Sequence, residues 1–268
     1  MTLPEAYWRD DKRGLVIYHG DCREVLPTFA DGQFGSVITD PPYFISRADK
    51  DIDRGNGSRF KGTPIKYDFG VWDHSEDPAD FTAEWVSQAS RILSPGGALV
   101  SYYDRSNLSH LIIPLLRDGL KLRNIIADCK ANPCPQLRKA GWAVGWEAAV
   151  VFEKPGRTRA YQWREGHHPD WFFRPVNWPN RLHPNEKCRA VMDDILRWWA
   201  RRDMPILDPF MGSGTTLVAA AKLGIPATGI EISEKYCRMA VCRLEGGFMD
   251  DEPAHLFNQE SIADDSRG

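Results

Sequence analysis

A short apolar run meets a double proline in Phe34-Gly35-Ser36-Val37-Ile38-Thr39-Asp40-Pro41-Pro42-Tyr43. The β-branched residues predict a buried strand over 34–38. Proline donates no ladder hydrogen bond and restricts the residue before it, so the strand should end at Asp40. Ligands of open α/β sheets bind at the carboxyl ends of strands. We expect the Asp40 carboxylate, the Asp40 and Pro41 carbonyls and an exposed Tyr43 ring to bind a planar base through its amino group. A strand-ending turn with a surface tyrosine is the alternative.

A second stretch, Ile206-Leu207-Asp208-Pro209-Phe210-Met211-Gly212-Ser213-Gly214-Thr215-Thr216, predicts a strand and a glycine turn before a helix over 217–223. The next strand, 227–231, ends at Glu231, 19 residues after Gly212. That spacing is typical of the carboxylate that binds ribose hydroxyls in nucleotide-binding folds. The third glycine of the dinucleotide motif is absent, and no P-loop lysine follows. The pattern favours an adenosyl ligand without phosphates over a purely structural turn.

The rest of the chain alternates between strand and helix patterns. We predict strands over 14–18, 98–103, 121–128 and 146–153, and helices over 22–29, 81–93, 106–118, 188–201 and 233–244. A turn at 94–97 should separate helix 81–93 from the following strand. This order predicts an α/β fold with a mostly parallel, doubly wound sheet, in which 121–128 and 146–153 form an antiparallel edge. We expect one catalytic domain over 1–245 and an acidic, mobile tail over 246–268.

Composition is that of a soluble globular protein, with 42% hydrophobic and 26% charged residues among 268. The sequence contains no long apolar segment for a membrane span and no signal-peptide pattern at its start. Its six cysteines never occur as Cys-x-x-Cys, which favours reduced thiols over disulfides or a zinc site. We therefore expect a cytoplasmic protein without a metal.

Positive charge is concentrated in the middle of the chain. Residues 121–202 hold 16 Lys and Arg against 8 Asp and Glu, a net of +8, within a chain of net charge −3. A basic region on an acidic body predicts a polyanion-binding surface, with a solvated basic face as the alternative. A long polar loop over 44–70 favours a DNA-contacting or lid role over a disordered insertion. Arginines interleave with aromatic residues over 155–180, a pattern that suits contacts with bases and phosphates. The candidate DNA-binding residues are Arg47, Arg54, Arg59, Lys61, Arg138, Lys139, Arg157, Arg159, Arg164 and Arg174.

Together, the Asp-Pro-Pro-Tyr and Asp-Pro-Phe-Met-Gly-Ser-Gly-Thr-Thr motifs resemble those of S-adenosylmethionine-dependent DNA amino-methyltransferases. Because the catalytic motif precedes the cofactor motif, the order is similar to that of the circularly permuted β class. The resemblance extends over about 14–245. Shorter supporting motifs are His19-Gly20-Asp21, Gly70-Val71-Trp72-Asp73, Arg91-Ile92-Leu93-Ser94-Pro95-Gly96-Gly97 and His183-Pro184-Asn185-Glu186-Lys187. Cys188 departs from the family pattern, which has proline there.

The resemblance implies a Rossmann-like methyltransferase fold and double-stranded DNA as the partner. The catalytic residues that it implies are Asp40, Pro41, Pro42 and Tyr43. The cofactor-binding residues that it implies for S-adenosylmethionine are Asp21, Asp40, His183, Lys187, Asp208, Phe210, Gly212, Ser213, Gly214, Thr215 and Glu231. The short insert at 155–180 would recognise a short target sequence. A homodimer and a cognate restriction nuclease are compatible with the resemblance, as is a prokaryotic or phage origin.

The expected reaction is methyl transfer to the exocyclic N6 amino group of a flipped adenine. Aspartate at position 40 favours adenine, whereas cytosine-N4 enzymes more often carry serine there. Cytosine-N4 methylation is the first alternative, and RNA or protein-glutamine methylation and an inactive DNA-binding module are more remote. Cytosine-C5 methylation would need a cysteine nucleophile, and Cys134 lacks the surrounding pattern for that role.

Overall fold

A nine-stranded sheet runs through the computed structural model, which describes residues 2–43, 77–131, 144–163, 168–174 and 189–246. Within that part of the chain the strand order is β1-β2-β9-β8-β3-β4-β6-β5-β7. The strands are β1 (Trp8–Asp10), β2 (Leu15–His19), β3 (Phe34–Thr39), β4 (Leu93–Tyr103), β5 (Lys121–Lys130), β6 (Trp146–Glu153), β7 (Trp171–Arg174), β8 (Ile206–Asp208) and β9 (Ala227–Glu231).

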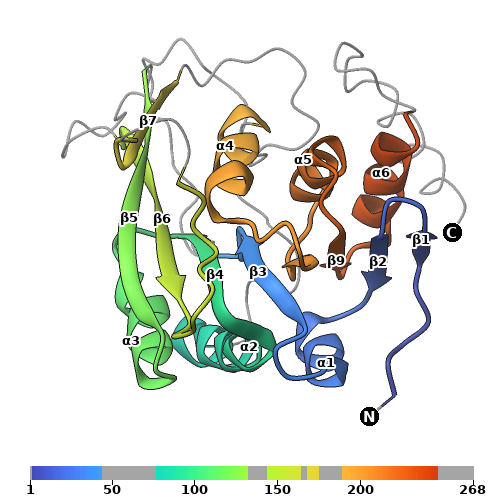
Figure 1. Cartoon of the computed structure of the whole chain (residues 1–268), viewed down its shortest axis with the longest axis horizontal. Helices are drawn as coiled ribbons and strands as arrows, with labels where there is room; N and C mark the ends of the chain where they lie inside the picture. Colours follow the sequence, from blue (N-terminus) through green and yellow to red (C-terminus); the bar gives the residue numbers. More distant parts are fainter. Residues whose placement is uncertain (1, 44–76, 132–143, 164–167, 175–188, 247–268) are drawn as a thin grey trace, which may run out of the picture.

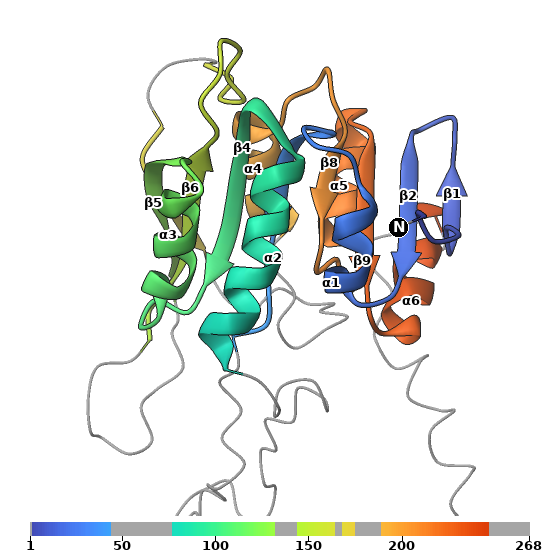
Figure 2. The ribbon, with the colours of Figure 1, turned by 90° about the horizontal axis from the view of Figure 1, so that it is seen from below.

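Helices cover both faces of this sheet (Figure 1). They are α1 (Cys22–Val25), α2 (Pro78–Ile92), α3 (Leu108–Arg117), α4 (Arg189–Trp199), α5 (Thr215–Leu223) and α6 (Glu234–Leu244), with a 3₁₀ turn at Leu26–Thr28. In Figure 1, α4, α5 and α6 lie above the sheet and α1, α2 and α3 lie below it. Figure 2, seen from below, shows α1, α2 and α3 side by side across that lower face. Two apolar clusters, one under each helix layer, form the core.

The centre of the sheet is parallel. Strands β2, β9, β8, β3 and β4 pair in parallel in that order, so their carboxyl ends lie at one edge. Every residue of β3 is buried, as expected for a strand that is covered on both faces. After β8 the chain passes through α5 to β9, whereas α2 on the opposite face precedes β4, which lies on the other side of β3. The strand order therefore reverses between β8 and β3, which is where open α/β sheets bind their ligands.

The predicted fold class is confirmed, and the antiparallel region is more extensive than we expected. Strands β5 and β6 are antiparallel, and β7 pairs in parallel with the outer side of β5. At the opposite edge β1 pairs with β2 in an antiparallel manner. Neither β1 nor β7 was predicted, because three and four residues are too few to show a clear alternation.

Three predicted boundaries are wrong. The segment 94–97 is not a turn, because β4 begins at Leu93, which pairs with Phe34. The Gly96 N–H donates to the Lys154 carbonyl and the Gly97 carbonyl accepts from the Lys154 N–H, which continues the pairing just beyond β6. Helix α2 begins at Pro78 instead of 81, since the Asp77 carboxylate accepts from the Ala79 N–H at 2.8 Å and caps the helix. The helix predicted over 22–29 is a single α-helical turn followed by the 3₁₀ turn.

Among the residues that the structure describes, no helix is both long and apolar enough to cross a lipid bilayer. The four cysteines in this part, Cys22, Cys129, Cys237 and Cys242, are free thiols. Cys134 and the tail beyond Gly246 lie outside the described residues.

Candidate active site

Four of the predicted acids lie at the carboxyl ends of four neighbouring strands. Asp21 follows β2, Glu231 ends β9, Asp208 ends β8 and Asp40 follows β3. Because these strands are adjacent and parallel in the order β2-β9-β8-β3, the sheet places the acids in one row. The row spans the point at which the strand order reverses, so residues from both motifs meet at the expected ligand site.

The catalytic motif forms an internal contact at the end of β3. The Tyr43 hydroxyl donates a short hydrogen bond to Oδ1 of Asp40. We predicted an exposed Tyr43 ring, but the ring is half-buried, and its centroid lies 5.9 Å from that of Tyr103. Burial, followed by the charge of Asp40, raises the pKa of Tyr43 well above its usual value. The phenol is therefore a protonated donor that occupies one oxygen of the carboxylate.

A buried hydrogen bond joins the catalytic strand to the cofactor strand. The Thr39 hydroxyl donates to Oδ1 of Asp208 at 2.7 Å, and the Phe210 N–H donates to the same oxygen at 3.1 Å. Thr216 also donates to this carboxylate. Burial raises the pKa of Asp208 to about 6, and the charge of Asp40 adds to that effect. The Asp208 carboxylate thus holds the two motifs together, a use that the sequence did not indicate.

The glycine turn, residues 211–214, approaches Glu231 through its backbone. Oε2 of Glu231 accepts from the Gly212 N–H at 2.9 Å, and Oε1 accepts from the Ser233 N–H at 2.8 Å. Gly212 has a φ of 55°, and a Cβ added there would meet no atom within 4 Å. The turn therefore leaves open space beside Gly212. Ile232 also contributes a backbone hydrogen bond to this carboxylate. A carboxylate has about four acceptor positions, so Glu231 keeps acceptor capacity for a ribose hydroxyl.

Asp21 and Phe210, two of the predicted cofactor-binding residues, have partners of their own. The Asp21 carboxylate caps α1 by accepting from the Arg23 N–H at 2.8 Å, and it forms an ion pair with the Arg23 guanidinium at 2.7 Å. These bonds lower the pKa of Asp21 against the opposing effect of burial. Arg23 therefore already occupies part of the Asp21 carboxylate. The Phe210 ring packs edge-on against Trp85 at 5.3 Å.

Ser213 and Thr215 are buried and face α6. Oγ of Ser213 accepts from Nη1 of Arg243 at 3.0 Å, and Oγ1 of Thr215 lies 3.3 Å from the same nitrogen. Gly214 has a φ of 84° and precedes α5 directly. Neither Arg243 nor Thr39 was predicted as a site residue, because no local pattern marks contacts between residues so distant in sequence.

The predicted DNA-binding residues are only partly described. Arg157 and Arg159 are exposed between β6 and β7, and Arg174 ends β7. Trp163, Trp171 and Phe173 are exposed, whereas Tyr161 and Phe172 pack against the core, so some of the aromatic residues between 155 and 180 serve packing. Arg47, Arg54, Arg59, Lys61, Arg138, Lys139 and Arg164 lie outside the described residues, as do His183 and Lys187.

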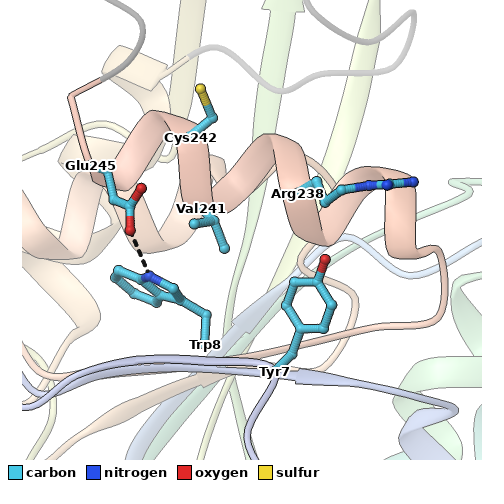
Figure 3. Close-up of a pocket in the computed structure, with 6 residues that line it drawn as sticks. All are labelled: Tyr7, Trp8, Arg238, Val241, Cys242 and Glu245. Carbon is cyan, nitrogen blue, oxygen red and sulfur yellow. Dashed lines mark hydrogen bonds between the residues drawn. The ribbon is translucent and has the colours of Figure 1, made fainter. Parts of the chain in front are cut away.

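A cavity of about 350 Å³ lies between the start of β1 and α6 (Figure 3). Its lining residues are Tyr7, Trp8, Arg238, Val241, Cys242 and Glu245. Nε1 of Trp8 donates to Oε1 of Glu245 at 3.0 Å and ties the first strand to the end of α6. Within the described part of the chain, no cluster of His, Cys, Asp or Glu is suited to hold a metal ion.

Comparison with known proteins agrees with this geometry. The N6_N4_Mtase family model, described as DNA methylase, matches residues 35–242, which is well over half of the chain. The chain belongs to this DNA methylase family. The match runs from β3 to α6, so it includes both the Asp-Pro-Pro-Tyr motif and the glycine-turn motif at the carboxyl ends of β3 and β8.

Individual proteins also resemble the chain over most of its length. The Type II methyltransferase M2.LlaDCHI of Lactococcus lactis subsp. cremoris is 27% identical over 264 residues, with 92% of this chain and 94% of the relative covered. The crystal structure of the M1.HpyAVI–SAM complex has a TM-score of 0.61 at 23% identity and covers 85% of this chain and 99% of its own. The cytosine-N4-specific PvuII DNA methyltransferase has a TM-score of 0.68 at 17% identity and covers 89% and 88%. These two structures show that the fold is that of DNA methyltransferases.

Proposed function

We propose that this protein transfers a methyl group from S-adenosylmethionine to the N6 amino group of adenine in a short sequence of double-stranded DNA. One observation carries the proposal: Asp40 lies at the carboxyl end of β3, beside the ends of β8 and β9 that hold the glycine turn and Glu231. The hydrogen bond from Thr39 to Asp208 joins these strand ends. Membership of the DNA methylase family supports the reaction class, and the similar M1.HpyAVI structure contains the methyl donor.

The donor suits the residues of the glycine turn. Backbone N–H groups hold Glu231 and leave acceptor capacity for a ribose hydroxyl, and the open space at Gly212 allows an adenosyl group close to the backbone. S-adenosylmethionine supplies an electrophilic methyl group when bound. No pyrophosphate needs to be accommodated, which agrees with the absence of a P-loop lysine.

Asp40 and Tyr43 act on the base. A base inside a duplex is out of reach, so the target nucleotide must be flipped into the site. The Asp40 carboxylate and the Pro41 carbonyl accept hydrogen bonds from the amino group and turn its lone pair towards the methyl group. Tyr43 must release Asp40 as the base enters, and its ring then stacks on the base, which is worth about 1–3 kcal/mol. Acceptors around the amino group stabilise the positive charge that develops on nitrogen.

Cytosine N4 is the second candidate, since PvuII methyltransferase, named as cytosine-N4-specific, shares the fold with a TM-score of 0.68. Both reactions present an amino group on a planar ring to the same acceptors. Asp40 as the first residue of the motif favours adenine. The relatives named as Type II methyltransferases favour a role in restriction and modification. A cognate nuclease and a homodimer remain predictions.

The Asp40→Ala variant tests the proposal. It should abolish methyl transfer to DNA and leave the Kd for S-adenosylmethionine within about threefold, because Glu231 and the glycine turn are untouched. Asp31→Ala is the matched control, since Asp31 precedes the same strand at its other end and its side chain is 80% exposed. Full methyl transfer by Asp40→Ala would contradict the assigned role of Asp40.

A further inference from the structure

The end of α6, which lies near β1 and β2 in Figure 1, contacts both the glycine turn and the β1–β2 hairpin. On the turn side, a Cβ added to Gly214 would lie 2.7 Å from Cβ of Ala240, so the turn and helix are in close contact. On the hairpin side, Nη1 of Arg13 donates to the Leu244 carbonyl at 2.9 Å, and Trp8 donates to Glu245 (Figure 3). The hairpin therefore fixes the last turn of α6 against the site.

Arg243 reaches from this last turn into the glycine turn. Its Nη1 donates to the Ser213 carbonyl at 2.9 Å and to Oγ of Ser213 at 3.0 Å. Oγ1 of Thr215 lies 3.3 Å from the same nitrogen. Nη1 carries only two hydrogens for three acceptors, so this longest contact is the weakest of the three. Bonds from a charged donor are stronger than neutral ones, and Ser213 and Thr215 are both buried. One guanidinium thus fixes both ends of the segment 213–215.

We propose that Arg243 is a positioning residue that holds the glycine turn in the shape that binds the adenosyl part of the methyl donor. The inference rests on the proposed function of the 211–214 turn. Arg243 binds the turn at the Ser213 carbonyl, and Glu231 binds it at the Gly212 N–H. Loss of the guanidinium should loosen the turn and weaken binding of the donor, whereas Asp40 and Tyr43 keep their own contacts. The effect should appear in the affinity for S-adenosylmethionine and not in the rate at saturation.

The test compares Arg243→Ala with Arg238→Ala. Arg238 lies on the same helix, but it lines the cavity of Figure 3 and its side chain is 69% exposed. Titration calorimetry with S-adenosylmethionine should show a Kd about tenfold higher for Arg243→Ala and unchanged for Arg238→Ala. Steady-state methylation should show the same rise in KM for the donor, with kcat within about twofold of the wild type. Arg243→Lys keeps the charge and can reach one acceptor, so it should recover part of the affinity.

A Kd and KM for Arg243→Ala that equal those of Arg238→Ala would overturn the inference. Equal losses of kcat and of kcat/KM at unchanged KM would also overturn it, since the residue would then act on the chemical step. If Arg243→Ala does not fold, Arg243→Lys is compared with Arg238→Lys, and an unchanged Kd overturns the inference in the same way. Failure of the proposed function is distinguishable, because the wild-type protein itself would then not methylate DNA.

Discussion

Replacing Thr39 with valine removes the hydrogen bond that joins the two motifs and changes little else. The side chains have similar shapes, and Thr39 is 1% exposed while Asp208 is 3% exposed, so water cannot readily replace the hydroxyl. A hydrogen bond to a charged group contributes about 1.5–3 kcal/mol, against about 0.5–1.5 kcal/mol for a neutral pair. We therefore expect Thr39→Val to lower the free energy of unfolding by about 1.5–3 kcal/mol at pH 8.

The loss should depend on pH because Asp208 titrates near 6 in the folded protein. The Thr39 hydroxyl stabilises the charged carboxylate, so its removal costs most above this pKa and falls to about 0.5–1.5 kcal/mol at pH 5. Urea unfolding followed by circular dichroism at both pH values measures the difference, and Thr39→Ser, which retains the hydroxyl, is the control. A loss below about 0.5 kcal/mol at pH 8, or one equal at both pH values, would refute the reasoning.

Three further predictions concern the same edge of the sheet. Glu231→Ala should raise the Kd for S-adenosylmethionine at least about tenfold, because hydrogen bonds to a carboxylate are strong. Calorimetry against Glu234→Ala, at an exposed position of α6, checks this, and equal affinities would remove the ribose role. Tyr43→Phe should keep kcat within about threefold because the ring remains, whereas Tyr43→Ala should lose about tenfold or more; equal losses in a methylation assay would argue against stacking. Burial raises the pKa of Asp208 from 3.8 to about 6, so the unfolded chain releases this proton first and stability falls as pH rises through that window. Asp208→Asn should abolish this loss. The unfolding free energy of the variant minus that of the wild type should therefore rise by about 1.4 kcal/mol from pH 5 to pH 7.5, and a difference that does not change with pH would contradict the assignment.

The row of acids could be predicted because each member has a local signal. Prolines end β3 directly after Asp40, and a glycine turn follows β8 at Asp208. Parallel pairing then brings the two strand ends together, which follows from the fold class. The sequence therefore indicated both the edge and its principal residues.

Contacts between segments distant in the chain could not be predicted. The bond from Thr39 to Asp208 crosses 169 residues, and that from Arg243 to Ser213 crosses 30, so no periodicity reports them. Strand β7 exists because Trp171 pairs with Ala127 on β5, and its own four residues carry too weak a pattern. The half-buried Tyr43 depends likewise on Tyr103, which belongs to a different strand.

The most direct test of the proposed reaction is mass spectrometry of nucleosides from unmethylated bacterial DNA treated with the protein and S-adenosylmethionine. The account predicts N6-methyladenine from the wild-type protein and none from Asp40→Ala. N4-methylcytosine would retain the site and the mechanism and overturn the choice of base. The absence of any methylated nucleoside, from a wild-type protein that binds S-adenosylmethionine, would contradict the claim that this edge of the sheet methylates DNA.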